Sequence, residues 1–173
     1  MQIGVVNGLR AERAERIFET VRNFGLKTCQ LISWKPDLWT AEMAAKVVSQ
    51  AAASGIRPCA FWAGYSGPAR WNFTEGPTTL GLVPPAYRDQ RVAELCRGAD
   101  FARQIGVPAV ITHCGFIPEN LTDPEYPGVV RAIAQVAEHC ARLGLEFWFE
   151  TGQETPVVLL RVIQEIGTGN LGI

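Results

Sequence analysis

The chain has 173 residues, of which 47% are hydrophobic, and this is enough for one compact domain over residues 1–173. Its 16 basic and 17 acidic side chains nearly cancel and form no run of like charge, which argues against nucleic acid or an anionic membrane as a partner. The five cysteines are scattered without a CxxC spacing, and no apolar run reaches membrane-spanning length, so we expect a soluble, cytoplasmic protein.

Short apolar runs alternate along the chain with longer segments of helical periodicity. The runs predict strands at 2–6, 27–33, 57–63, 108–113 and 145–150, with the start of a sixth at 170–173. The longer segments predict helices at 10–24, 41–54, 86–105, 128–143 and 156–166. Most of the strands are apolar on both faces, which is typical of parallel strands covered by other elements. The order therefore indicates about five βα units plus the start of strand six.

One connection is much longer than an ordinary βα loop. The stretch 64–85, GYSGPARWNFTEGPTTLGLVPP, follows the third predicted strand without clear periodicity and contains Tyr65, Trp71 and Phe73. A loop of this length is often functional. It is also explained by a surface excursion whose aromatic side chains pack on the domain. The sequence leaves both interpretations open, and in the first of them Trp71 would contact substrate.

Two parallel architectures fit this order of elements, an open doubly wound sheet and a closed (β/α)8 barrel. A dinucleotide-binding sheet would carry GxGxxG after its first strand, whereas VVNGLRAER has one glycine there, and no P-loop is present. In a barrel, functional groups gather at the carboxyl ends of the strands, where Trp34, His113 and Glu150 are expected. We therefore predict an α/β fold of the (β/α)8 TIM-barrel type, incomplete in this chain.

The runs AYRDQRVAELCRGADFARQIGVPAVITHCGFIPEN and CARLGLEFWFETGQETP resemble the xylose isomerase-like TIM-barrel family of sugar and sugar-phosphate isomerases and epimerases. The resemblance covers nearly the whole chain and is strongest at the helix with Arg88 and Arg91, at THCG and at FETGQE. It implies a site for Mn, Mg or Co at the barrel mouth, bound by two glutamates, an aspartate and a histidine from later strands. Glu150 matches the first of these glutamates.

The resemblance assigns Glu150 two roles, metal ligand and catalytic group. A metal polarises the carbonyl and the neighbouring hydroxyl of the sugar, and a carboxylate moves the proton on the adjacent carbon. The implied function is metal-dependent isomerisation or epimerisation of a small-molecule sugar or sugar phosphate. A structural alternative for Glu150 is a strand-end carboxylate that caps a helix or pairs with an arginine.

Other candidate substrate-binding residues each have a structural alternative. Glu154 would lie near the substrate hydroxyls, or it would belong to a capping box before the last helix. His113 would orient substrate or the first metal ligand, or it would be a satisfied core histidine. Trp34 would stack on a sugar face or belong to the core. Arg88 would bind a phosphate or carboxylate, or it would lie on a solvated helix face.

Length is the main departure from the family pattern. A complete barrel takes about 250 residues. This chain stops inside the expected sixth strand, so the implied aspartate, histidine and second glutamate are absent. We expect an inactive fragment that binds metal only weakly and that associates, as a homo-oligomer, through unpaired strand edges.

Two other functional classes are left open by the sequence. The first is a non-catalytic barrel fragment that serves as a binding or assembly unit. The second is a zinc-dependent abasic-site endonuclease, since the superfamily resemblance extends to such enzymes. An endonuclease of this kind needs further histidines at the ends of its early strands, and the strand ends VVNG and FWAG contain none. The near-zero net charge also offers no attraction for DNA phosphates.

Overall fold

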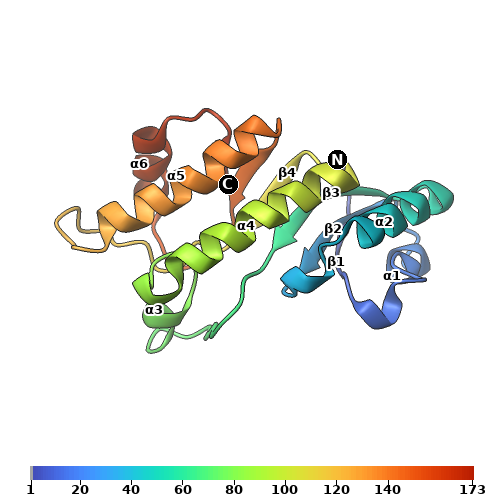
Figure 1. Ribbon diagram of the computed structural model, residues 1–173, viewed down its shortest axis with the longest axis horizontal. Helices are drawn as coiled ribbons and strands as arrows, with labels where there is room; N and C mark the ends of the chain where they lie inside the picture. Colours follow the sequence, from blue (N-terminus) through green and yellow to red (C-terminus); the bar gives the residue numbers. More distant parts are fainter. Residues whose placement is uncertain (1) are drawn as a thin grey trace.

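The computed structural model describes residues 2–173 and contains one parallel sheet of six strands in the order β1-β2-β3-β4-β5-β6 (Figure 1). The strands are β1 (Val5–Gly8), β2 (Thr28–Ser33), β3 (Arg57–Ala63), β4 (Ala109–Thr112), β5 (Glu146–Phe149) and β6 (Leu171–Gly172). Each strand pairs with the next one along the chain. Sequential order is what the wall of a (β/α)8 barrel requires, whereas a dinucleotide-binding sheet reverses its order at a switch point. The prediction of an incomplete TIM-barrel fold is confirmed.

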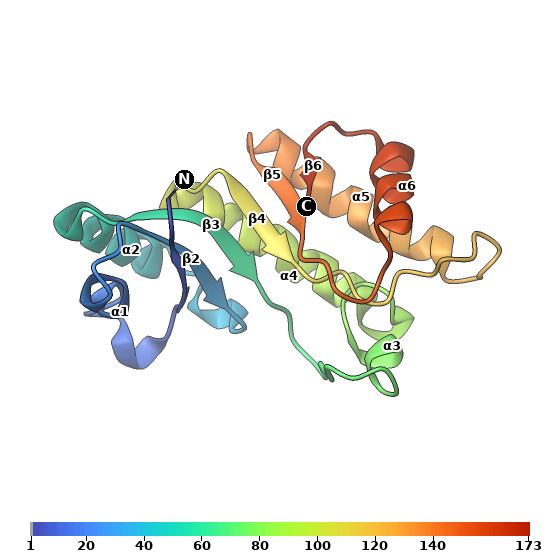
Figure 2. The ribbon, with the colours of Figure 1, turned by 180° about the vertical axis from the view of Figure 1, so that it is seen from behind.

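The long helices cover one face of this sheet. They lie in front of the strands in Figure 1 and behind them in the opposite view of Figure 2. The helical elements are η1 (Ala11–Arg13), α1 (Glu19–Asn23), η2 (Pro36–Leu38), α2 (Ala41–Ser54), α3 (Gly76–Thr79), α4 (Pro85–Ile105), α5 (Tyr126–Arg142) and α6 (Pro156–Ile166). None of the helices in the described part of the chain is long and apolar enough to cross a membrane.

The core lies between the sheet and the long helices, which do not cover the other face of the sheet. Fully buried side chains from the strands include Leu31, Phe61 and Phe147. They pack in one cluster with helical side chains such as Leu95 and Ile133. Because side chains alternate across a strand, the residues next to these core positions face the opposite side, which is the inner side of the barrel wall.

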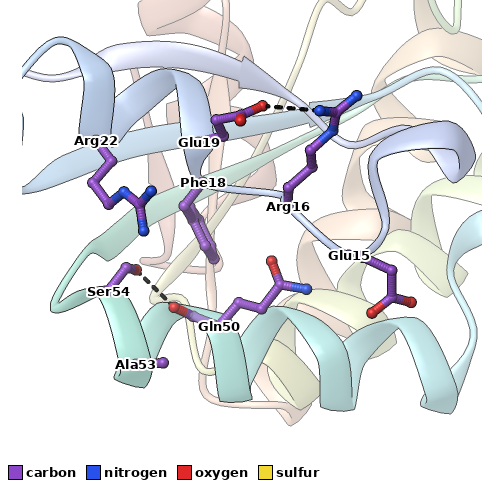
Figure 3. Close-up of a pocket in the computed structure, with 8 residues that line it drawn as sticks. All are labelled: Glu15, Arg16, Phe18, Glu19, Arg22, Gln50, Ala53 and Ser54. Carbon is purple, nitrogen blue, oxygen red and sulfur yellow. Dashed lines mark hydrogen bonds and ion pairs between the residues drawn. The ribbon is translucent and has the colours of Figure 1, made fainter.

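The helix predicted over 10–24 is correct only in part, because the chain forms the short η1 and α1 with turns between them. Side chains from other elements bind the backbone groups that a continuous helix would use. Asn7 Nδ2 donates to the carbonyl of Ile17 at 2.9 Å. Gln50, which projects from α2 (Figure 3), accepts from the N–H of Ile17 at 2.8 Å and donates to the carbonyl of Ala14 at 2.7 Å. These tertiary bonds replace helical ones, since each backbone group needs a partner.

Arg91 of α4 organises the long loop after β3. Its side chain is fully buried, and its guanidinium donates to four loop carbonyls at 2.7–3.2 Å, those of Ser66, Pro68, Thr79 and Gly81. It also lies over the rings of Tyr65 and Tyr87, 4.4 and 4.8 Å from their centroids. A buried guanidinium without hydrogen-bond acceptors is very costly, so these carbonyls and the arginine depend on each other. The loop is thereby attached to α4 through its own backbone.

We predict that Arg91→Met releases this loop. Arg70 lies in the loop and its side chain is 66% exposed, so trypsin cleavage after Arg70 reports on loop opening. A hydrogen bond to a charged group contributes about 1.5–3 kcal/mol. A loss of about 1.4 kcal/mol raises the open population tenfold, so cleavage should accelerate at least about tenfold. Arg103→Met, on the exposed surface of the same helix, is the matched control. Equal cleavage rates in the two variants would contradict the assignment.

Candidate functional site

Glu150 follows β5 at the carboxyl end of the strand. Its N–H donates to the carbonyl of Thr112 at 2.9 Å, which continues the pairing of β4 with β5. Its Oε2 accepts a hydrogen bond from Nε1 of Trp62, on β3, at 2.8 Å. Because β4 lies between β3 and β5, the carboxylate reaches across the inner face of the sheet and does not point toward the helices. Glu150 caps no helix and pairs with no arginine among the described residues.

The carboxylate borders a hollow of about 270 Å³ on this inner face. Its lining comes from β1, β2, β3, the long loop and the end of β5, and consists of Val6, Gln30, Ile32, Trp34, Trp62, Trp71 and Glu150. An apolar concavity with few polar groups is the usual form of a small-molecule site. Its position at the carboxyl ends of the strands is also where TIM barrels bind their substrates.

A second hollow, shown in Figure 3, lies between α1 and the C-terminal end of α2. Since α2 ends where the chain turns into β3, this hollow belongs to the amino ends of the strands. In a TIM barrel, that end contributes to stability, while the chemistry takes place at the other end. The hollow beside Glu150 is therefore the candidate site.

Tryptophan and tyrosine side chains form one wall of the candidate site. The ring centroid of Trp34 lies 4.7 Å from that of Trp62, 5.3 Å from that of Tyr65 and 6.2 Å from that of Trp71. Trp34 approaches the backbone closely, because a Cβ on Gly64 would lie 2.7 Å from its ring. The structure thus brings the two tryptophans named from the sequence, Trp34 and Trp71, together with the Glu150 hollow.

His113 lies directly behind this wall, after β4. Its side chain is 1% exposed, and its Nδ1 accepts the N–H of Gly115 at 3.0 Å, so the neutral ring carries its proton on Nε2. Nε2 has no partner among the described residues. The ring meets Trp71 edge-on at 4.9 Å, and a Cβ on Gly152 would lie 3.1 Å from Nε2. His113 is therefore buried, but it is not the satisfied core histidine that the sequence allowed.

Glu154 lies in the turn between Glu150 and α6 and is also buried. Its Oε2 accepts the N–H of Gln153 at 3.2 Å, and its Oε1 has no partner among the described residues. The capping-box alternative is not formed, because Thr155 alone caps α6 through Val158. Burial, with a smaller contribution from the charge of Glu154, raises the pKa of the Cys114 thiol nearby. That thiol is accordingly not a nucleophile at neutral pH.

Arg88 is committed to other partners. Its Nε donates to the carbonyl of Leu82 at 2.7 Å, and its Nη2 donates to the carbonyl of Val83 and pairs with Glu125 at 2.6 Å. These contacts join the end of the long loop to the start of α5. The side chain is only 14% exposed and does not line the hollow. Arg88 therefore lies neither on a solvated helix face nor beside Glu150.

A divalent cation would find one suitable ligand in this part of the chain. Across residues 2–173, no three His, Cys, Asp or Glu side chains lie close enough together to hold a metal ion. Glu150 offers a carboxylate, the ligand type that Mg²⁺ and Mn²⁺ prefer, and only its Oε2 is bound to a protein donor. A single carboxylate with one oxygen free of protein donors is what the described residues offer to such a cation.

Sequence reasoning missed Trp62 and the role of Arg91. For Trp62 a signal was available, because alternation along β3 must place the adjacent Phe61 and Trp62 on opposite faces of the sheet. One of these two rings therefore had to face the barrel interior. For Arg91 no local signal exists, since its four acceptors are backbone carbonyls of a loop without periodicity.

Comparison with known proteins extends these observations. The sequence profile described as xylose isomerase-like TIM barrel matches residues 18–173. The xylose isomerase domain protein from Planctomyces limnophilus is 32% identical, with a TM-score of 0.91 over 99% of this chain and 60% of its own. L-ribulose 3-epimerase is 18% identical, with a TM-score of 0.72 over 98% of this chain and 58% of its own. No curated protein matches the sequence.

A xylose isomerase-like TIM barrel protein from Mycobacterium smegmatis, solved in complex with magnesium, is 14% identical with a TM-score of 0.68. The alignment covers 98% of this chain and 62% of that one. The chain thus spans about 60% of the length of these solved relatives. On the profile match and the 32% identity over nearly its whole length, the chain belongs to the xylose isomerase-like TIM barrel family.

Proposed function

We propose that this chain is the part of a metal-dependent sugar isomerase or epimerase that supplies the first carboxylate of the reaction site. The observation that carries the proposal is the position of Glu150 at the carboxyl end of β5, facing a hollow walled by tryptophans. Membership of a family whose solved relatives include an L-ribulose 3-epimerase supports the reaction class. The magnesium complex of another relative supports a divalent cation.

In the proposed reaction, Glu150 removes a proton from the carbon next to the sugar carbonyl. A divalent cation held in part by Glu150 would polarise the carbonyl and the neighbouring hydroxyl. Glu150 would supply one ligand oxygen and accept the proton. In an isomerase this proton would return to the former carbonyl carbon, while the hydroxyl proton passes to the former carbonyl oxygen. An epimerase needs a second acid on the opposite face of that carbon. The family resemblance assigns this acid to the later strands, together with the remaining metal ligands.

The other residues of the site would bind the sugar. Trp34 and Trp71 present ring surfaces to the hollow, on which the C–H face of a sugar would pack. His113 Nε2 is a buried donor and Glu154 Oε1 a buried acceptor, and neither has a partner among the described residues. Substrate hydroxyls would become their partners after a small movement of the turn that follows Glu150. An unsatisfied buried group costs about 1–3 kcal/mol, so this pairing would favour binding.

Other parts of the proposal concern assembly and location. β1 and β6 are edge strands with one neighbour each, and later strands or a second copy of the chain would pair with them. All five cysteines are free, as expected in a reducing compartment such as the cytoplasm.

A competing function, a non-catalytic sugar-binding or assembly unit, is favoured by the finding that residues 2–173 hold no complete set of metal ligands.

We predict that Glu150→Gln removes activity. The protein would be expressed with any coding sequence that continues past Ile173, supplied with Mn²⁺ and assayed for conversion of D-fructose and D-fructose 6-phosphate. Loss of a general base lowers kcat by at least about 100-fold. Glu138→Gln, on the exposed face of α5, is the control and should keep wild-type activity. Metal-independent sugar binding without turnover in the unmodified protein would support the non-catalytic alternative.

Removing the ring of Trp71 should weaken sugar binding without unfolding the protein. Aromatic stacking contributes about 0.5–1.5 kcal/mol, so Trp71→Ala should raise the dissociation constant for the converted sugar about three- to tenfold. Because the ring is half exposed, its removal should cost little stability. Phe73→Ala, in the same loop but outside the hollow, should leave the constant unchanged in a calorimetric titration. Equal effects of the two substitutions would argue against a binding role for Trp71.

A further inference from the structure

We infer that Trp62 is a positioning residue that sets the orientation of the Glu150 carboxylate. Its indole Nε1–H donates to Oε2 of Glu150 at 2.8 Å. This is the only hydrogen bond that the described residues make to the Glu150 side chain. The part of the inference that concerns catalysis rests on the proposed function, whereas the contact itself does not.

Trp62 is suited to this role because it cannot move easily. Its side chain is 2% exposed, and the ring of Trp34 lies 4.7 Å from its own. In the sheet, Trp62 pairs with Ile32 of β2 on one side and with Ile111 of β4 on the other. The donor therefore projects from an interior strand, held by neighbours on both sides. The Glu150 carboxylate, in contrast, is exposed and has several rotatable bonds.

The dependence between the two side chains is mutual. Hydrogen bonds to an ionised carboxylate are among the stronger ones in proteins, so the bond restricts the rotamers of Glu150. Trp62 Nε1 would otherwise be a buried donor without a partner, which is the condition of Trp39 Nε1 elsewhere in the core. Trp62 Nε1 thus has a carboxylate acceptor, whereas Trp39 Nε1 has no partner among the described residues.

The contact also determines which oxygen is available. An indole N–H is a donor only, so Trp62 cannot accept the proton that Glu150 takes from a substrate. Its bond uses one lone pair of Oε2 and leaves Oε1 without a donor among the described residues. Partners that orient a metal-binding side chain commonly change metal affinity or activity 10–100-fold when they are removed. Trp62 thus contributes to the reaction through Glu150 and not by contact with substrate.

The bond can be tested in the 173-residue protein by NMR of its ¹⁵N-labelled tryptophan side chains. Trp62→Phe identifies the Trp62 indole signal by its disappearance. Glu150→Ala should shift this signal more than any other indole signal, because its acceptor is lost. Glu154→Ala removes a carboxylate that accepts no indole hydrogen bond among the described residues and should leave the signal in place. An unshifted Trp62 signal in Glu150→Ala would overturn the inference. Where Trp62→Phe does not fold, NOEs from the indole to the Trp62 backbone and to the neighbouring Trp34 ring assign the signal in the unmodified protein.

The functional consequence is measured by Mn²⁺ titration and kinetics of the protein that carries any continuation past Ile173. Trp62→Phe should weaken Mn²⁺ binding about 10–100-fold and lower kcat more than it changes KM. Trp39→Phe removes a buried indole N–H that has no partner, and it controls for general loss of packing. Equal Mn²⁺ affinity in the two variants would overturn the positioning role. If the unmodified protein bound no Mn²⁺ and converted no sugar, the proposed function would fail while the NMR result still decided the contact.

Discussion

Parallel pairing between consecutive strands is the constraint on which the candidate site depends. Because all six strands run in one direction and in chain order, their carboxyl ends lie along one edge of the sheet. Trp34, Trp62, His113 and Glu150 come from four different strands or strand ends, and only this arrangement brings them together. The long helices α2, α4 and α5 lie on one face of the sheet, and the hollow lies on the other.

The buried guanidinium of Arg91, on helix α4, holds the long loop that follows β3. Arg91 has no carboxylate partner within its hydrogen bonds and is satisfied by loop carbonyls and two tyrosine rings. The loop that it holds brings Trp71 against His113 and beside Trp34. The two interpretations that the sequence left open for this loop are therefore related, because the same aromatic residues pack on the domain and line the candidate site.

The site combines one carboxylate with an apolar wall, which suits proton transfer at carbon. The indole of Trp62 orients the carboxylate, and the ring of Trp34 packs against that indole. The chain spans about 60% of the length of its solved relatives. In the proposed function, Glu150 is one contributor to the site, and the remaining groups would come from later strands.

Periodicity and strand-end position were sufficient to predict most elements, the barrel type and the place of Glu150, because these depend on local pattern and on a rule about parallel strands. Three features depended on contacts between distant residues. Gln50 and Asn7 interrupt the helix expected over 10–24, Arg88 is bound by loop carbonyls and Glu125, and Trp62 meets Glu150 across β4. A hydrogen bond between residues far apart in the chain leaves no periodic trace in the sequence, so only the tertiary structure could decide these partners.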